Sequence, residues 1–141
     1  RAMIAQIESI YAKAGKEEAG KALLAQVGRE IVELNNRGVL AARGGDLDGS
    51  VKLLMEAAER VPNLQFLINA SKAIFTLLEI KGWNPALAKR GLGYLRTAQE
   101  KDLRNPKVIS AREMYERVSR KYGIAVVPLT ATRKQAEQPR T

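Results

Sequence analysis

One segment in the first half of the chain, residues 34–62, constrains the fold more than any other. Gly44 and Gly45 interrupt it, and Asp46 follows at a position suited to cap the start of a second helix. Gly38 stands where two helices would have to approach closely. We therefore predict a helix-turn-helix hairpin, whose second helix carries apolar residues at spacings of three and four before a terminating proline: Leu47, Val51, Leu54, Ala58, Val61 and Pro62.

The same apolar periodicity recurs along most of the chain and predicts an all-α fold of about seven helices. Asn63 and Asn84 are good N-terminal caps, and Pro85 and Pro106 suit the first position of a helix. A break is expected at Gly28, which would separate two short helices. The predicted helices span residues 2–14, 17–27, 29–43, 47–61, 64–81, 85–102 and 106–122, and a disordered basic tail is expected over residues 125–141.

Composition excludes several kinds of chemistry. The chain has no cysteine and no histidine, which removes thiol nucleophiles, Cys/His zinc sites and Ser-His-Asp triads. Two acid pairs, Asp46/Asp48 and Glu56/Glu59, are explained by helix capping and by the polar face of a helix. No apolar run approaches the ~20 residues of a membrane-spanning helix. We expect a cytoplasmic protein that is not an enzyme and holds no metal or cofactor.

The order and spacing of these features resemble the tetratricopeptide repeat (TPR), a two-helix repeat of ~34 residues with conserved glycine, aromatic, alanine and proline positions. In the second hairpin Phe75 matches the aromatic position, while Gly91, Leu95 and Ala98 match positions of the second helix. The resemblance implies a TPR-like α-solenoid of antiparallel helical hairpins. Such arrays need end elements, because each hairpin buries its apolar face only against a neighbour.

The resemblance also implies a domain organisation. Residues 29–124 would hold the TPR-like repeats and a capping helix, and residues 1–28 would form an N-terminal hairpin that is a degenerate repeat or cap. The whole pattern is similar to the C-terminal TPR region of bacterial two-component response regulators. A phosphorylatable receiver domain precedes the repeats in that group, and it would lie outside this chain.

In TPR proteins the first helix of each hairpin lines a concave groove, where asparagines often bind a peptide backbone. By this resemblance we expect a scaffold that binds a protein or peptide segment. The alternative is that these asparagines make local or inter-helix hydrogen bonds. The expected groove residues recur at spacings of three and four along two helices: Val32, Asn36, Val39, Arg43, Asn69 and Ala73.

The net charge of +9 is unevenly distributed. Residues 1–80 carry ten basic and ten acidic side chains, whereas residues 81–141 carry fourteen basic and five acidic ones. Arg117, Arg120 and Lys121 form a basic cluster that could attract an acidic segment, unless it is a solvated, salt-bridged helix face. The alternative function is a basic α-helical module that binds nucleic acid through its phosphates.

Overall fold

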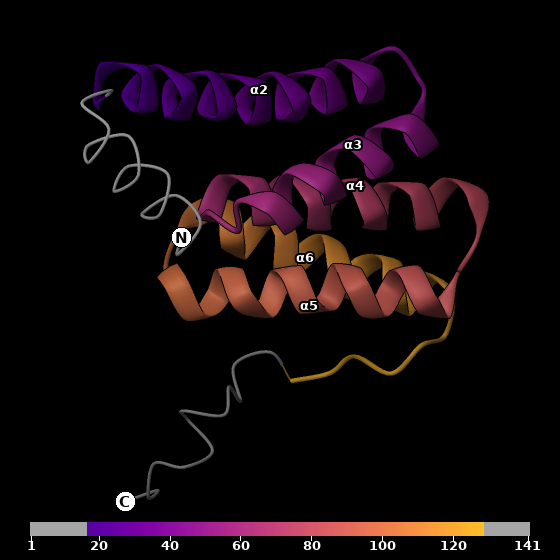
Figure 1. The fold of residues 1–141 in the computed structure, drawn as a ribbon. Coiled ribbons are helices and arrows are strands. Elements are labelled where there is room, and N and C mark those ends of the chain that lie inside the picture. The colour runs from indigo at the N-terminus through magenta and orange to yellow at the C-terminus, as the bar shows by residue number, and fades with distance from the viewer. Residues whose placement is uncertain (1–16, 129–141) are drawn as a thin grey trace, which may run out of the picture.

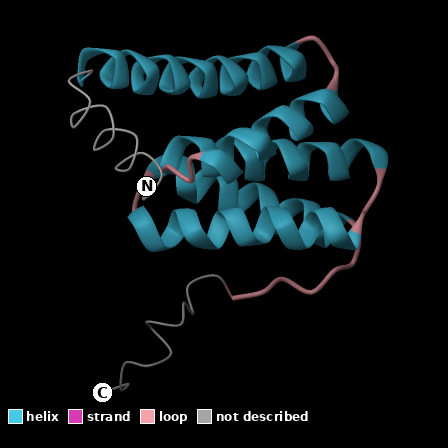
Figure 2. Cartoon of the chain, in the orientation of Figure 1, coloured by secondary structure: helices cyan, strands magenta, loops and turns pink. Residues whose placement is uncertain are grey.

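Residues 17–128 are described in the computed structural model, and they form five helices joined by short loops (Figure 1). This part of the chain contains no strand, which confirms the all-α prediction (Figure 2). The helices are α2 (Glu17–Arg43), α3 (Leu47–Arg60), α4 (Leu64–Lys81), α5 (Pro85–Asp102) and α6 (Pro106–Lys121).

Polar side chains cap the starts of four helices, as the sequence predicted. The side chain of Asp46 accepts a hydrogen bond from the backbone of Gly49 at the start of α3. Asn63, Asn84 and Asn105 cap α4, α5 and α6 in the same way. Each cap satisfies a backbone N–H that has no partner within its own helix, so these residues fix where the helices begin.

The predicted break at Gly28 is wrong, because α2 runs without interruption through it. A glycine inside a helix costs roughly 1 kcal/mol relative to alanine. Ending the helix there would leave backbone groups unpaired at two new termini, and Arg29 offers no capping oxygen. The expected boundary between residues 1–28 and 29–124 therefore falls within a single helix. The helix predicted over residues 2–14 lies outside the described residues, which hold five helices instead of seven.

Helix α4 lies at the centre of the described part and contacts all four other helices. Successive helices pack antiparallel, α2 on α3, α3 on α4 and α4 on α5 (Figure 1). Helix α4 also reaches α2 and α6, whereas the backbones of α3 and α5 do not approach each other closely. The described helices therefore form two rows, α2–α4–α6 and α3–α5. The core between them includes Phe75, whose ring meets that of Tyr115 edge-on at 5.2 Å.

Gly38 permits the close approach of α2 and α3, as the sequence predicted. A Cβ atom at this position would lie 2.7 Å from two side-chain carbons of Leu54. Gly91 has the same role between α5 and α4, where a Cβ would lie 2.9 Å from Ile74 and 3.0 Å from Phe75. Both hairpins therefore depend on a missing side chain at their closest contact.

The chain leaves the helical body as an extended segment that stays attached to it. Residues 124–128 contain no helix. Val126 nevertheless packs against the core, and the backbone N–H of Val127 donates to the hydroxyl of Tyr115 at 2.8 Å. The first residues of the expected 125–141 tail are thus held to α6. Residues 129–141 lie outside the described part of the chain.

Two glycines on α2 provide a matched test of this fold. We expect Gly38→Leu to lower the free energy of unfolding by about 1–3 kcal/mol, because the new side chain would collide with Leu54. Gly28→Ala should instead be neutral or stabilising by up to about 1 kcal/mol, since nothing lies within 4 Å of its Cβ position and alanine favours helix. Urea unfolding followed by circular dichroism measures both. A clear destabilisation by Gly28→Ala would contradict the continuous helix.

Candidate functional site

Four of the six predicted groove residues line one cavity. It has a volume of about 270 Å³ and lies among α2, α3, α4 and α6. We call it the central cavity. Sequence analysis had identified Val39, Arg43, Asn69 and Ala73 of its lining. The remaining described lining residues are Ala42, Leu47, Ser50, Leu54, Lys72, Thr76 and Met114.

The walls of the central cavity are mainly apolar, with polar groups at a few places. The hydroxyl of Thr76 donates to the carbonyl of Lys72 at 2.8 Å, and Met114 Sδ lies 3.7 Å from the same hydroxyl oxygen. The hydroxyl of Ser50 is buried and has no hydrogen-bond partner. It is one of four such side-chain groups among the described residues, and the one that lines the cavity.

The structure places Val32 and Asn36 apart from the central cavity. Both are exposed on α2, beside a second hollow whose described lining also includes Ala25, Gly28, Arg29 and Glu33. Residues 32 and 43 share one helix face, but eleven residues of helix extend about 16 Å. Only the C-terminal end of that face reaches the cavity beside α4. The predicted groove is therefore divided between the central cavity and a separate hollow on α2.

A chain of hydrogen bonds connects three helices beside the cavity. Asn69 Nδ2 of α4 donates to Asn35 Oδ1 of α2 at 3.1 Å, and Gln65 Nε2 donates to Asn69 Oδ1 at 2.8 Å. Lys107 Nζ of α6 donates to Gln65 Oε1 at 3.3 Å. Asn35 is buried, so its bond to Asn69 satisfies a polar group that has no access to water. Asn69 thus holds α2 against α4, which is the inter-helix role left open by the sequence.

Two basic side chains line the central cavity. Arg43 lies in the last turn of α2, and Lys72 lies in the middle of α4. Neither forms an ion pair within the part of the chain that the structure describes. The described lining contains no acidic residue. The described lining of the cavity therefore carries positive charge and no carboxylate.

The predicted basic cluster, by contrast, is engaged with the rest of the protein. Arg117 pairs with Glu79 at 3.2 Å, and Lys121 Nζ donates to the backbone carbonyl of Glu79 at 2.9 Å. Arg120 lies 3.8 Å from Glu116 on its own helix. These contacts attach α6 to the C-terminal end of α4. They fit the salt-bridged helix face that the sequence offered as one reading.

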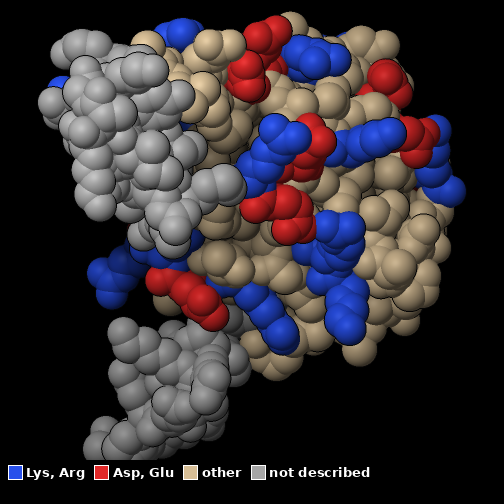
Figure 3. Space-filling model, in the orientation of Figure 1, with Lys and Arg blue, Asp and Glu red and all other residues tan. Residues whose placement is uncertain are grey.

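Acidic and basic side chains are also interspersed on the face formed by α3 and α5 (Figure 3). There Glu59 Oε1 accepts hydrogen bonds from Tyr94 at 2.6 Å and from Arg90 at 2.5 Å. The bond from Tyr94, followed by that from Arg90, lowers the pKa of the Glu59 carboxyl. Burial and the adjacent carboxylate raise the pKa of Tyr94. This cluster joins two helices whose backbones do not approach each other closely, so its role is to hold α3 and α5 together.

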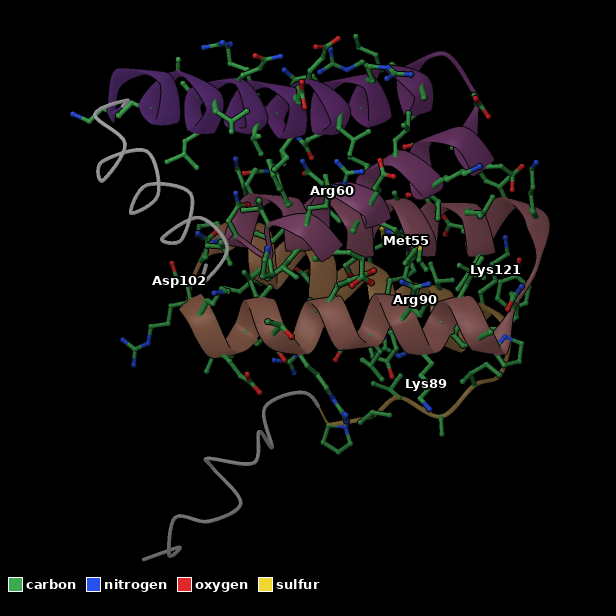
Figure 4. The ribbon with its side chains drawn as sticks, viewed as in Figure 1. Met55, Arg60, Lys89, Arg90, Asp102 and Lys121 are labelled. Atoms are coloured by element: carbon green, nitrogen blue, oxygen red, sulfur yellow. The ribbon has the colours of Figure 1, made fainter. Side chains whose placement is uncertain are left out.

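A separate hollow lies on this face, between α3 and α5, and we call it the α3–α5 hollow. Met55 of α3 and Arg90 of α5 are among its lining residues and are labelled in Figure 4. Arg90 pairs with Glu59 there, and Lys52, which also lines the hollow, has no ion pair within residues 17–128. Three carboxylates, of Asp48, Glu56 and Glu59, line the same hollow. The positive charge of this hollow is therefore offset by carboxylates, whereas the described lining of the central cavity contains none.

Sequence reasoning missed the contributions of Lys72, Thr76 and Met114 to the cavity. Lys72 and Thr76 could have been found, because they continue the three- and four-residue spacing of Asn69 and Ala73 along one face of α4. Met114 lies on α6, 38 residues from Thr76, and no local pattern brings the two together.

Comparisons of the chain with protein-family models, with curated proteins and with solved structures found no significant match. Among the described helices, none combines the length and apolar character needed to cross a bilayer.

The hydrogen bond between Asn35 and Asn69 can be tested by substitution. Asn69→Ala should lower the free energy of unfolding by about 1–3 kcal/mol, because it leaves the buried amide oxygen of Asn35 unpaired. Asn36→Ala, one residue from Asn35 but exposed, should change stability by no more than about 0.5 kcal/mol. Urea unfolding of the two variants makes the comparison. Equal effects would show that the bond to Asn35 contributes nothing to stability.

Proposed function

We propose that this chain is a protein-interaction module that binds a segment of another protein in the central cavity. The observation that carries the proposal is the combination of apolar walls with polar groups left open. Arg43 and Lys72 line the cavity and have no acidic partner within residues 17–128. Charged side chains beside an apolar cavity can bind an opposite charge of a ligand without breaking an existing ion pair, which favours a site that is completed by a ligand.

The arrangement of helices supports the same proposal. Helices α2 and α3 would form one TPR-like hairpin, α4 and α5 a second, and α6 the capping helix. In that scheme the row α2–α4–α6 corresponds to the groove side of a TPR array, and the central cavity opens among these three helices and α3. By the resemblance described above, such a module would serve as the output region of a response regulator.

A binding role for nucleic acid is less well supported. Affinity for nucleic acid comes mainly from basic side chains that contact phosphates. Arg117, Arg120 and Lys121 are engaged with Glu79 and Glu116, and acids alternate with bases across the α3–α5 face (Figure 3). The groups left open at the cavity are suited to binding rather than to acid-base catalysis, because its described lining offers no carboxylate.

Filling the central cavity tests the proposal. Ala73→Leu adds volume to its wall, and we expect at least tenfold weaker binding of peptides selected from a displayed random library against the full chain. Ala86→Leu adds the same atoms on the exposed start of α5 and should leave affinity unchanged. Isothermal titration calorimetry measures affinity, and thermal melting confirms that both variants are folded. Equal affinities of the two folded variants would move the binding site away from the cavity.

A further inference from the structure

We infer that the bound segment is acidic and that it inserts one apolar side chain into the central cavity, while Arg43 and Lys72 bind the acidic groups beside that side chain. This inference rests on the proposed function and adds the chemistry of the partner. It assigns recognition of the acid to two residues in the half of the chain that has no net charge. The basic cluster at the end of α6 has no part in it.

Charge complementarity supports the claim that the bound segment is acidic. Arg43 and Lys72 come from different helices, and both line the cavity. Several other basic side chains of the described part already have acidic partners, such as Arg117 with Glu79 and Arg90 with Glu59. Among the described lining residues of the three hollows, only the central cavity combines basic side chains with no acidic residue. A carboxylate at the cavity mouth would gain charge-assisted hydrogen bonds from Arg43 or Lys72 without breaking an existing ion pair. A basic segment would meet two like charges there.

The size and lining of the cavity support the claim that one apolar side chain of the segment enters it. Pockets that enclose a whole small molecule measure about 300–1,000 Å³. At about 270 Å³ the central cavity is smaller, so it suits one anchoring side chain of a longer segment. Its walls include Val39, Leu54 and Met114, and a methionine wall adapts to side chains of different shape. The anchor is therefore apolar, in the size range of leucine, methionine or phenylalanine.

Selection from a displayed library of random twelve-residue peptides against the full chain tests the recognition of acids. We expect enriched peptides to carry Asp or Glu next to a large apolar residue. Synthetic copies should bind at least tenfold more weakly to the double variant Arg43→Gln/Lys72→Gln. The matched control, Lys89→Gln/Arg96→Gln, removes two exposed charges from α5 and should change affinity less than twofold.

The methionines report which hollow the peptide occupies in the unaltered protein. The chain has three, and methyl-¹³C labelling gives one NMR signal for each. Met114 lines the central cavity, Met55 lines the α3–α5 hollow, and Met3 lies outside the described residues. The selected peptide should shift the Met114 signal and leave that of Met55 in place. This measurement needs no variant, so it holds even where a substitution impairs folding.

The possible outcomes separate the two proposals. Enriched peptides that shift Met114 but carry no acids would overturn the acidic partner and leave the proposed function standing. Acidic peptides whose affinity falls with Arg117→Gln/Arg120→Gln, and not with Arg43→Gln/Lys72→Gln, would transfer recognition of the acid to α6 and overturn the inference. Selection that yields no peptide able to shift Met114 would overturn both.

Discussion

The burial of α4 on nearly every side is the constraint on which the rest of the structure depends. Its buried residues include Phe66, Leu67, Ile74, Phe75 and Leu78, which do not lie on a single stripe. A helix that is apolar over most of its circumference must be covered over most of it, and the other four described helices supply that cover. Cover is incomplete where α4 presents the small side chains of Ala73 and Thr76, and there the central cavity remains.

Local features of the chain were predictable because their causes are local. The caps at Asp46 and Asn63, and the close approach at Gly38, follow from side-chain chemistry within a few residues. The prediction at Gly28 was wrong because a glycine only weakens a helix and does not by itself end it. No capping residue follows Gly28, so the helix continues through it. The division of the predicted groove depends on where α4 crosses α2, which apolar spacing along one helix does not specify.

Net charge along the sequence did not reveal that part of the predicted basic cluster is engaged, while Arg43 and Lys72 have no ion pair in the described part of the chain. The excess of nine positive charges belongs to residues 81–141, and it includes Arg117 and Lys121. Both contact Glu79, a partner some forty residues away that no spacing of three or four would reveal. Arg43 and Lys72 belong to the half with balanced charge, yet they have no ion pair within residues 17–128. Pairing across the fold therefore decides which charges stay available.

The hydrogen-bond chain beside the cavity bears on how a segment would bind. Asn35, Asn69, Gln65 and Lys107 connect α2, α4 and α6, three of the four helices that surround the central cavity. Because Asn35 is buried, separating α2 from α4 would leave its amide without a partner, which opposes widening of the cavity. A cavity held at fixed width loses little conformational freedom when a ligand enters. In the proposed complex, Asn69 would therefore contribute by fixing the spacing of the helices that hold Arg43 and Lys72, instead of by contacting the ligand.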